Sequence, residues 1–190
     1  MQIKEIRPFY SSIYKIDVDF LSDIIEDQIL ENQHNDDGRV VSNRKGWQSQ
    51  NFSYGVSKEL DSLIDNIVPI ISKIYQETGI LRDPRLGGYW FNIGKKGSYN
   101  LAHNHPGAYL SAVLYVKVPN NSGNIIFERT DALCDWTIID KVTERNWGTY
   151  YIEPYKNLLV IFPAYMKHYV EENITNDDDD RRISIAFNFK

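Results

Sequence analysis

Three of the four histidines in this chain are spaced so that they could bind one metal ion. His103 and His105 lie two residues apart, and His168 follows an apolar, strand-like run much later in the sequence. Residues i and i+2 of an extended backbone point to the same side, so the first two imidazoles could reach the same ion. Neutral imidazoles suit divalent transition metals. On spacing alone, a metal site and three separate surface histidines explain the pattern about equally well.

The last strand-like run carries a second chemical signal. Over residues 182–189, isoleucine and phenylalanine alternate with small or polar residues, which predicts a strand with one apolar and one polar face. The small or polar positions are Arg182, Ser184, Ala186 and Asn188. If this face lined a cavity, the Arg182 guanidinium would need a carboxylate partner, because an unpaired buried charge is costly. A ligand or the acidic run 177–180 could supply that carboxylate; the alternative is an ordinary half-solvated strand.

Two amphipathic helices are predicted in the first half of the chain, where they could support these strands. Apolar residues at helical spacing indicate one helix over 20–33 and another over 59–78. Ser57 is a suitable N-cap for the second helix, and Pro69 should kink it because proline lacks a backbone donor. The polar segment between the helices, residues 34–51, is typical of a loop.

From about residue 89 the chain becomes a series of short β-patterned runs separated by turn signals. The runs are 89–93, 109–118, 124–128, 136–139, 149–152, 157–162, 167–171 and 182–189. So many short strands predict a sandwich or jelly roll, with the helices packed outside one sheet. No linker or repeat divides the sequence, so we expect one domain over 1–190. Within it, 1–85 would be a strand and helical support region and 86–190 the catalytic core.

Composition and charge narrow the class of protein. The formal net charge is −5, from 21 Lys and Arg against 26 Asp and Glu, which argues against duplex nucleic acid or an anionic membrane as an obligate partner. The single cysteine, Cys134, excludes an internal disulfide and a cysteine-rich metal site. The sequence contains no long apolar run and starts without an apolar signal-peptide core, so we expect a cytoplasmic protein.

The order and spacing of several motifs resemble the Fe(II)/2-oxoglutarate-dependent oxygenases, and most closely the small members found in bacteria and tailed phages. The motifs are Trp90-Phe91-Asn92-Ile93, His103-Asn104-His105-Pro106-Gly107, residues 110–116, residues 122–127, Phe162-Pro163 with His168, and residues 182–188. Residues 44–49 also resemble the start of that subfamily. The resemblance implies a mainly β fold, a double-stranded β-helix or jelly roll with flanking helices.

The resemblance also assigns roles to individual residues. In the superfamily, a His-x-Asp or His-x-Glu pair and a distal histidine hold the iron. The resemblance matches these three positions to His103, His105 and His168, so His105 stands where the usual carboxylate would be. Arg182 matches the arginine that grips the distal carboxylate of 2-oxoglutarate. Further positions on the cosubstrate side of related enzymes are matched by Tyr115, Asn92, Ser184 and Asn188.

The activity that the resemblance implies is oxidative decarboxylation of 2-oxoglutarate coupled to C–H hydroxylation, with Fe(II), 2-oxoglutarate and O₂ required. A peptidyl or amino-acid side chain, or another small molecule, is the substrate expected by analogy with prolyl hydroxylases. Two other classes stay open. One is a cupin-like three-His dioxygenase or isomerase that uses no 2-oxoglutarate, and the other is a non-catalytic β-sandwich binding module.

Two details of the site have alternatives of their own. In a second register, His105 is the first ligand and Gly107 stands at an open carboxylate position, as in halogenases, which leaves His103 without a role. The loops 32–50 and 131–148 are candidate rims of the site, although aromatic and arginine residues in loops more often simply pack the loop. The residues concerned are Trp47, Trp136, Trp147, Arg44 and Arg145.

Overall fold

Two β-sheets and two helices make up the part of the chain that the computed structural model describes, residues 11–129, 141, 143, 146–177 and 180–190. In chain order the elements are β1 (Tyr14–Asp17), α1 (Ile24–Asn35), β2 (Asn43–Arg44), β3 (Trp47–Gln48), α2 (Lys58–Glu77), β4 (Leu86–Gly94), β5 (Tyr99–His103), β6 (Leu110–Lys117), β7 (Ile125–Glu128), β8 (Thr149–Ile152), β9 (Leu158–Pro163), β10 (His168–Val170) and β11 (Arg182–Phe189). Neither helix is both long and apolar enough to cross a membrane.

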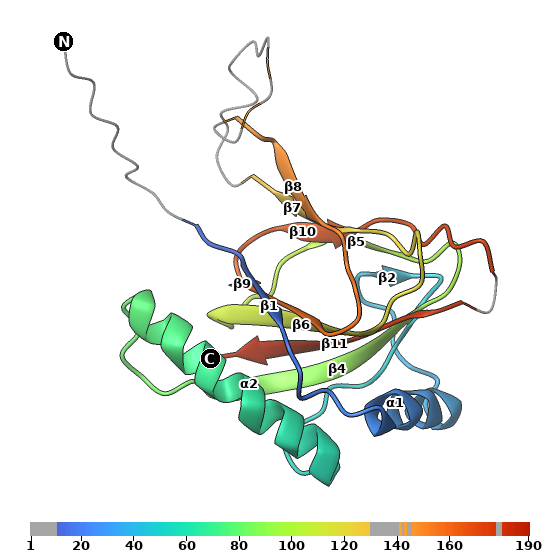
Figure 1. Cartoon of the computed structure of the whole chain (residues 1–190), viewed down its shortest axis with the longest axis horizontal. Coiled ribbons are helices and arrows are strands. Elements are labelled where there is room, and N and C mark those ends of the chain that lie inside the picture. Colours follow the sequence, from blue (N-terminus) through green and yellow to red (C-terminus); the bar gives the residue numbers. More distant parts are fainter. Residues whose placement is uncertain (1–10, 130–140, 142, 144–145, 178–179) are drawn as a thin grey trace.

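The sheets face each other, and neighbouring strands run antiparallel in both. The major sheet has the order β1-β9-β6-β11-β4-β3, and the minor sheet has the order β2-β5-β10-β7-β8. In Figure 1 the minor sheet lies above the major sheet and both helices lie below it. This arrangement confirms the mainly β fold with flanking helices and the jelly-roll core.

The alternation of apolar and polar side chains along β11 determines which face of the major sheet packs against the helices. The apolar side chains of β11, from Ile183 to Phe189, lie in the core between the major sheet and the helices. That core also receives the apolar stripe of α2, which includes Leu63, Ile67 and Ile71. Because successive side chains on a strand point to opposite faces, Arg182 and the other polar positions of β11 face the minor sheet. A second core, with Tyr115, Phe127 and Phe162, fills the space between the sheets.

The predicted helices are present, and one is displaced. The Ser57 hydroxyl accepts a hydrogen bond from the amide of Leu60 at 3.2 Å, and α2 continues through Pro69 to Glu77. The first helix starts at Ile24, four residues later than predicted, because residues 20 and 21 cover the core from the segment before it. The helical spacing of those residues was therefore misleading.

Seven of the predicted strands lie in the described residues, and six of them match within one residue; β4 begins three residues early. The run predicted at 136–139 lies outside the described residues. No residue range was predicted for β1, β2, β3 or β5, although a strand was expected within 1–85. Both β2 and β3 are only two residues long and lie in the segment interpreted as a loop. They become strands by pairing with β5 and β4, not through their own pattern.

Candidate active site

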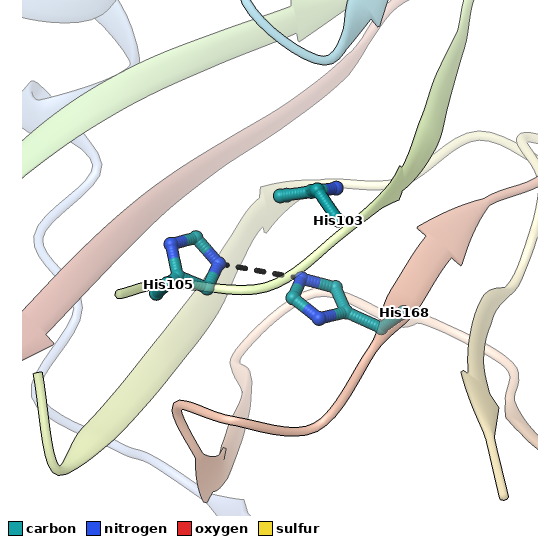
Figure 2. A group of neighbouring side chains, drawn as sticks. All are labelled: His103, His105 and His168. Carbon is teal, nitrogen blue, oxygen red and sulfur yellow. Dashed lines mark hydrogen bonds between the residues drawn. The ribbon is translucent and has the colours of Figure 1, made fainter. Parts of the chain in front are cut away.

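The minor sheet brings the three predicted histidines together. His103 ends β5 and lies directly opposite His168, the first residue of β10. His105 follows in the turn after β5, where its amide donates to the Ala164 carbonyl at 2.9 Å. One ring nitrogen from each histidine can be chosen so that all three lie within 4.8 Å of one another. Figure 2 shows the rings gathered at one place, with a contact between His105 and His168.

Backbone carbonyls fix the orientation of two of these rings. His103 Nδ1 lies 2.7 Å from the Leu101 carbonyl, and His168 Nδ1 lies 3.0 Å from the Met166 carbonyl. A carbonyl oxygen can only accept, so in both rings Nδ1 carries the proton and Nε2 keeps its lone pair. The Nε2 atoms of His105 and His168 are 3.3 Å apart. A carbonyl that holds one ring nitrogen while the other faces outward is the usual support of a metal-binding histidine.

Burial keeps these imidazoles neutral. It lowers the pKa of His105 to about 3, with a further contribution from the neighbouring histidines, and lowers the pKa of His168 to about 4. The pKa of His103 is also lowered by burial. A neutral imidazole is the form that binds a metal, and three nitrogen donors suit Fe(II) and related divalent ions. The donor set therefore fits a non-haem iron ion.

A buried arginine lies at the other end of the space between the sheets. Arg182 begins β11 and is only 6% exposed. Its Nη1 donates to the carbonyls of Ser122 and Gly123 in the turn between β6 and β7. Among the described residues, no carboxylate forms an ion pair with it. Burial lowers its pKa, as expected for a cation without a counter-ion.

Two buried serines beside this guanidinium have hydroxyl groups without hydrogen-bond partners. Ser98 and Ser122 are almost fully buried, and the Oγ atom of each lacks a hydrogen-bond partner. A Cβ atom placed on Gly94 would lie 2.7 Å from Ser98 Oγ and 3.3 Å from Arg182 Nη2, so the glycine keeps this space open. Buried polar groups without partners are rare in proteins. A cation with free hydroxyls beside it fits a carboxylate such as the distal group of 2-oxoglutarate.

Most of the other predicted cosubstrate residues lie at the same end of the major sheet as Arg182. Tyr115 is buried, and burial raises its pKa to about 12 although the nearby Arg182 charge acts in the opposite direction. Ser184 lies between Asn92 of β4 and Tyr115 of β6 in the sheet register. Asn188 lies at the opposite end of β11, where its Oδ1 accepts a hydrogen bond from Ser111 at 2.8 Å. The structure therefore groups all of these residues except Asn188.

The predicted rim residues contribute little to this site. The Trp47 indole donates to the Asp36 carbonyl at 2.8 Å and packs against the helix-side core. Arg44 donates to the backbone carbonyls of Val41 and Asn43. Trp147 is 40% exposed and lies beside Tyr150, with ring centroids 5.3 Å apart. Trp136 and Arg145 lie outside the described residues.

Sequence reasoning missed several side chains of the site. Ser42 Oγ lies 3.5 Å from His103 Nε2 and accepts from the Asn100 side chain at 3.1 Å. The Trp90 ring lies 5.6 Å from the His105 ring. The only signal for Ser42 was its place beside the 44–49 segment. Nothing in the spacing distinguished Ser98 or Ser122, because only the fold brings their turns to Arg182.

Solved structures with the same fold include three prolyl hydroxylases. A Pseudomonas putida prolyl-4-hydroxylase has a TM-score of 0.68 at 16% identity, covering 95% of this chain and 92% of that chain. The viral collagen prolyl hydroxylase of Paramecium Bursaria Chlorella virus-1, solved with 2-oxoglutarate, has a TM-score of 0.61 at 15% identity, covering 93% and 94%. A Trichoplax adhaerens prolyl hydroxylase bound to a hypoxia inducible factor peptide has a TM-score of 0.58 at 14% identity, covering 93% and 82%.

Sequence comparison identifies the family. The search of curated proteins gives no match. The family model described as "Putative 2OG-Fe(II) oxygenase" matches residues 88–188, which is more than half of the chain and includes the three histidines and Arg182. This match favours the oxygenase over a cupin without 2-oxoglutarate and over a non-catalytic module. The chain belongs to this 2-oxoglutarate- and Fe(II)-dependent oxygenase family.

Proposed function

We propose that this protein is a hydroxylase that couples oxidative decarboxylation of 2-oxoglutarate to hydroxylation of a peptidyl or amino-acid substrate. His103, His105 and His168 hold the Fe(II), and Arg182 anchors the cosubstrate. One observation carries the proposal: three neutral imidazoles converge at one end of the inter-sheet space, and an unpaired buried guanidinium lies at the other. When bound, the iron with O₂ supplies the oxidising chemistry, which yields succinate, CO₂ and a hydroxylated substrate.

The chain holds the metal ligands in place before the metal binds. The carbonyls of Leu101 and Met166 fix the rings of His103 and His168, so little freedom is lost when the metal binds. Three neutral ligands leave the full 2+ charge of the metal uncompensated. This charge favours the dianionic 2-oxoglutarate as the group that completes the site.

The far end of the site selects the cosubstrate. Arg182, supported by the hydroxyl of Tyr115, pairs with the distal carboxylate and directs the keto-acid end toward the histidines. The free hydroxyls of Ser98 and Ser122 donate to the same carboxylate, which satisfies groups that otherwise lack partners. Phe127 and Phe162 pack against the His168 ring and exclude water from the space between the sheets.

The substrate reaches the site from the histidine end. His103 and His105 are partly exposed, whereas Arg182 is buried. A substrate therefore meets the metal first, with the cosubstrate deeper inside. The peptide assignment is supported by the similar prolyl hydroxylases, one of which was solved with a peptide bound.

An anaerobic titration of untagged protein with Fe(II) and 2-oxoglutarate tests the proposal. We expect a visible charge-transfer absorption that requires both components, and succinate formation once O₂ is admitted. Metal uptake without a 2-oxoglutarate-dependent absorption or succinate would show that the three histidines serve a different reaction.

A further inference from the structure

A positively charged groove lies outside the candidate active site, beside the end of α1. Its volume is about 660 Å³. The cations that line it are Arg39, Lys45, Lys95, Lys96 and Arg181, and among the lining residues Asp37 is the only acid. In Figure 1 the surrounding elements, α1, β2 and the end of β4, gather at the right of the molecule. So many cations around one groove contrast with the net charge of −5 of the whole chain.

Three of these cations form no ion pair among the described residues. Lys45 and Lys95 form no ion pair there. Arg181 donates to the neutral amide of Gln33 at 3.2 Å. Arg39 Nε donates to the Ser49 carbonyl at 2.9 Å, and its charge also contributes to lowering the pKa of the Asp36 carboxyl. Like charges held around one groove repel one another, and an anionic ligand would relieve that repulsion.

The groove leads toward the histidines through one aromatic side chain. The Arg39 guanidinium carbon lies 6.0 Å from the centroid of the Trp90 ring, and that ring is 5.6 Å from the His105 ring. Lys95 and Lys96 directly follow β4, the strand that carries Trp90. A chain lying in the groove could therefore pass over Trp90 and bring its next residues to the metal site.

We propose that this groove docks an acidic stretch of the polypeptide substrate, next to the residue that is hydroxylated. This inference rests on the proposed function. Val40, which lines the groove, is 79% exposed, and the adjacent Val41 is 58% exposed. Apolar side chains among cations suit a peptide that carries both carboxylates and apolar residues. A long nucleic acid is less suited, because it would extend beyond the groove over the rest of a chain whose net charge is −5, whereas a short acidic stretch would stay within the groove.

Fluorescence anisotropy with a fluorescein-labelled, glutamate-rich peptide tests the inference on the full-length protein. A lysine-rich peptide of equal length and an oligothymidylate serve as comparison probes. The double variant Lys45→Gln/Lys95→Gln removes two groove charges outside the candidate catalytic and cosubstrate residues. The matched control, Lys58→Gln/Lys73→Gln, removes two exposed charges from α2.

We expect the glutamate-rich peptide to bind the parent protein and the control equally. The groove variant should bind it about fivefold more weakly, and added salt should weaken the parent's binding. Equal binding by both double variants, or preference for either comparison probe, would overturn the inference. The Fe(II) and 2-oxoglutarate titration separates this result from the proposed function. Both double variants should show the same charge-transfer absorption as the parent. If the parent itself shows no such absorption, the proposed hydroxylase activity is refuted, and the peptide-binding result still tests the groove on its own.

Discussion

The Nε2 atom of His105 lies 3.3 Å from that of His168, whose other ring nitrogen faces the Met166 carbonyl. His168 Nε2 can therefore only accept, so His105 either donates a proton to it or shares a cation with it. In the superfamily that this chain resembles, the residue at the position of His105 is usually an aspartate or glutamate. This relationship makes His105 the residue on which the identity of the metal site can be tested most directly.

Replacing His105 by Asp should preserve Fe(II) binding, because a carboxylate is a good iron ligand at this position. Replacing it by Ala should weaken Fe(II) affinity by more than about a hundredfold, because losing a ligand costs more than losing a residue that supports a ligand, which already costs about 10–100-fold. Anaerobic equilibrium dialysis with Fe(II) measures both. If the alanine variant binds iron like the parent, His105 is not a ligand.

His103→Ala distinguishes the two ligand registers. If His103 is the first ligand, the variant loses metal and 2-oxoglutarate turnover together. In the second register, with an open position at Gly107, His103 has no role and the variant keeps both. Iron analysis with a succinate assay on the same preparation decides between these outcomes, and His34→Ala, at an exposed histidine of α1, is the control.

Arg182→Ala should retain the metal but bind 2-oxoglutarate at least about thirtyfold more weakly, because truncating one member of a buried charge pair costs about 2–5 kcal/mol. The adjacent Arg181→Ala is the matched control, since Arg181 is only partly buried and donates to Gln33. Titration of the Fe(II)-loaded proteins with 2-oxoglutarate gives the affinities. Parent-like affinity in Arg182→Ala would show that the carboxylate anchor lies elsewhere.

The sequence was sufficient for those features that depend on a local pattern. The alternation in β11 showed which side chains face the core and which face the interior, because strand periodicity fixes the face directly. The apolar face of α2 and its N-cap, Ser57, were predicted for the same reason, because both depend only on residues close together in the chain. The three histidines were found because His103 and His105 lie only two residues apart and His168 has a place in a family motif.

Features that depend on distant pairing were not predictable. The strand β5, which carries His103, buries none of its side chains and forms because β10 and β2 pair with it. Ser98 and Ser122 look like ordinary turn residues. Their importance arises only because the turns after β4 and β6 meet at the guanidinium of Arg182.

Acid should destabilise the metal-free protein through its buried histidines. Burial holds the pKa of His105 at about 3 and that of His168 at about 4, below the ordinary value of 6.5. At a pH between the folded and the unfolded pKa, the unfolded chain binds more protons than the folded protein. The free energy of unfolding therefore decreases as the pH falls from 6.5 toward 4. Thermal unfolding in the presence of a chelator should show this slope. The slope should be shallower in His105→Gln, and a slope equal to that of the parent would contradict the assignment.

Gly94→Ala should block the cosubstrate end of the site without disturbing the histidines. The new Cβ would lie 2.7 Å from Ser98 Oγ and 3.3 Å from Arg182 Nη2, so these groups must move out of the position that holds the carboxylate. We expect 2-oxoglutarate affinity to fall about tenfold, consistent with the cost of overpacking a buried site, while Fe(II) affinity stays unchanged. Gly87→Ala is the matched control at the other end of β4, because there the closest contact is with the flexible Lys190 side chain, 3.1 Å away. Titrations of both variants with Fe(II) and then with 2-oxoglutarate separate the two affinities. Equal loss of 2-oxoglutarate binding in both would mean that strain in β4, and not the space beside Arg182, is responsible.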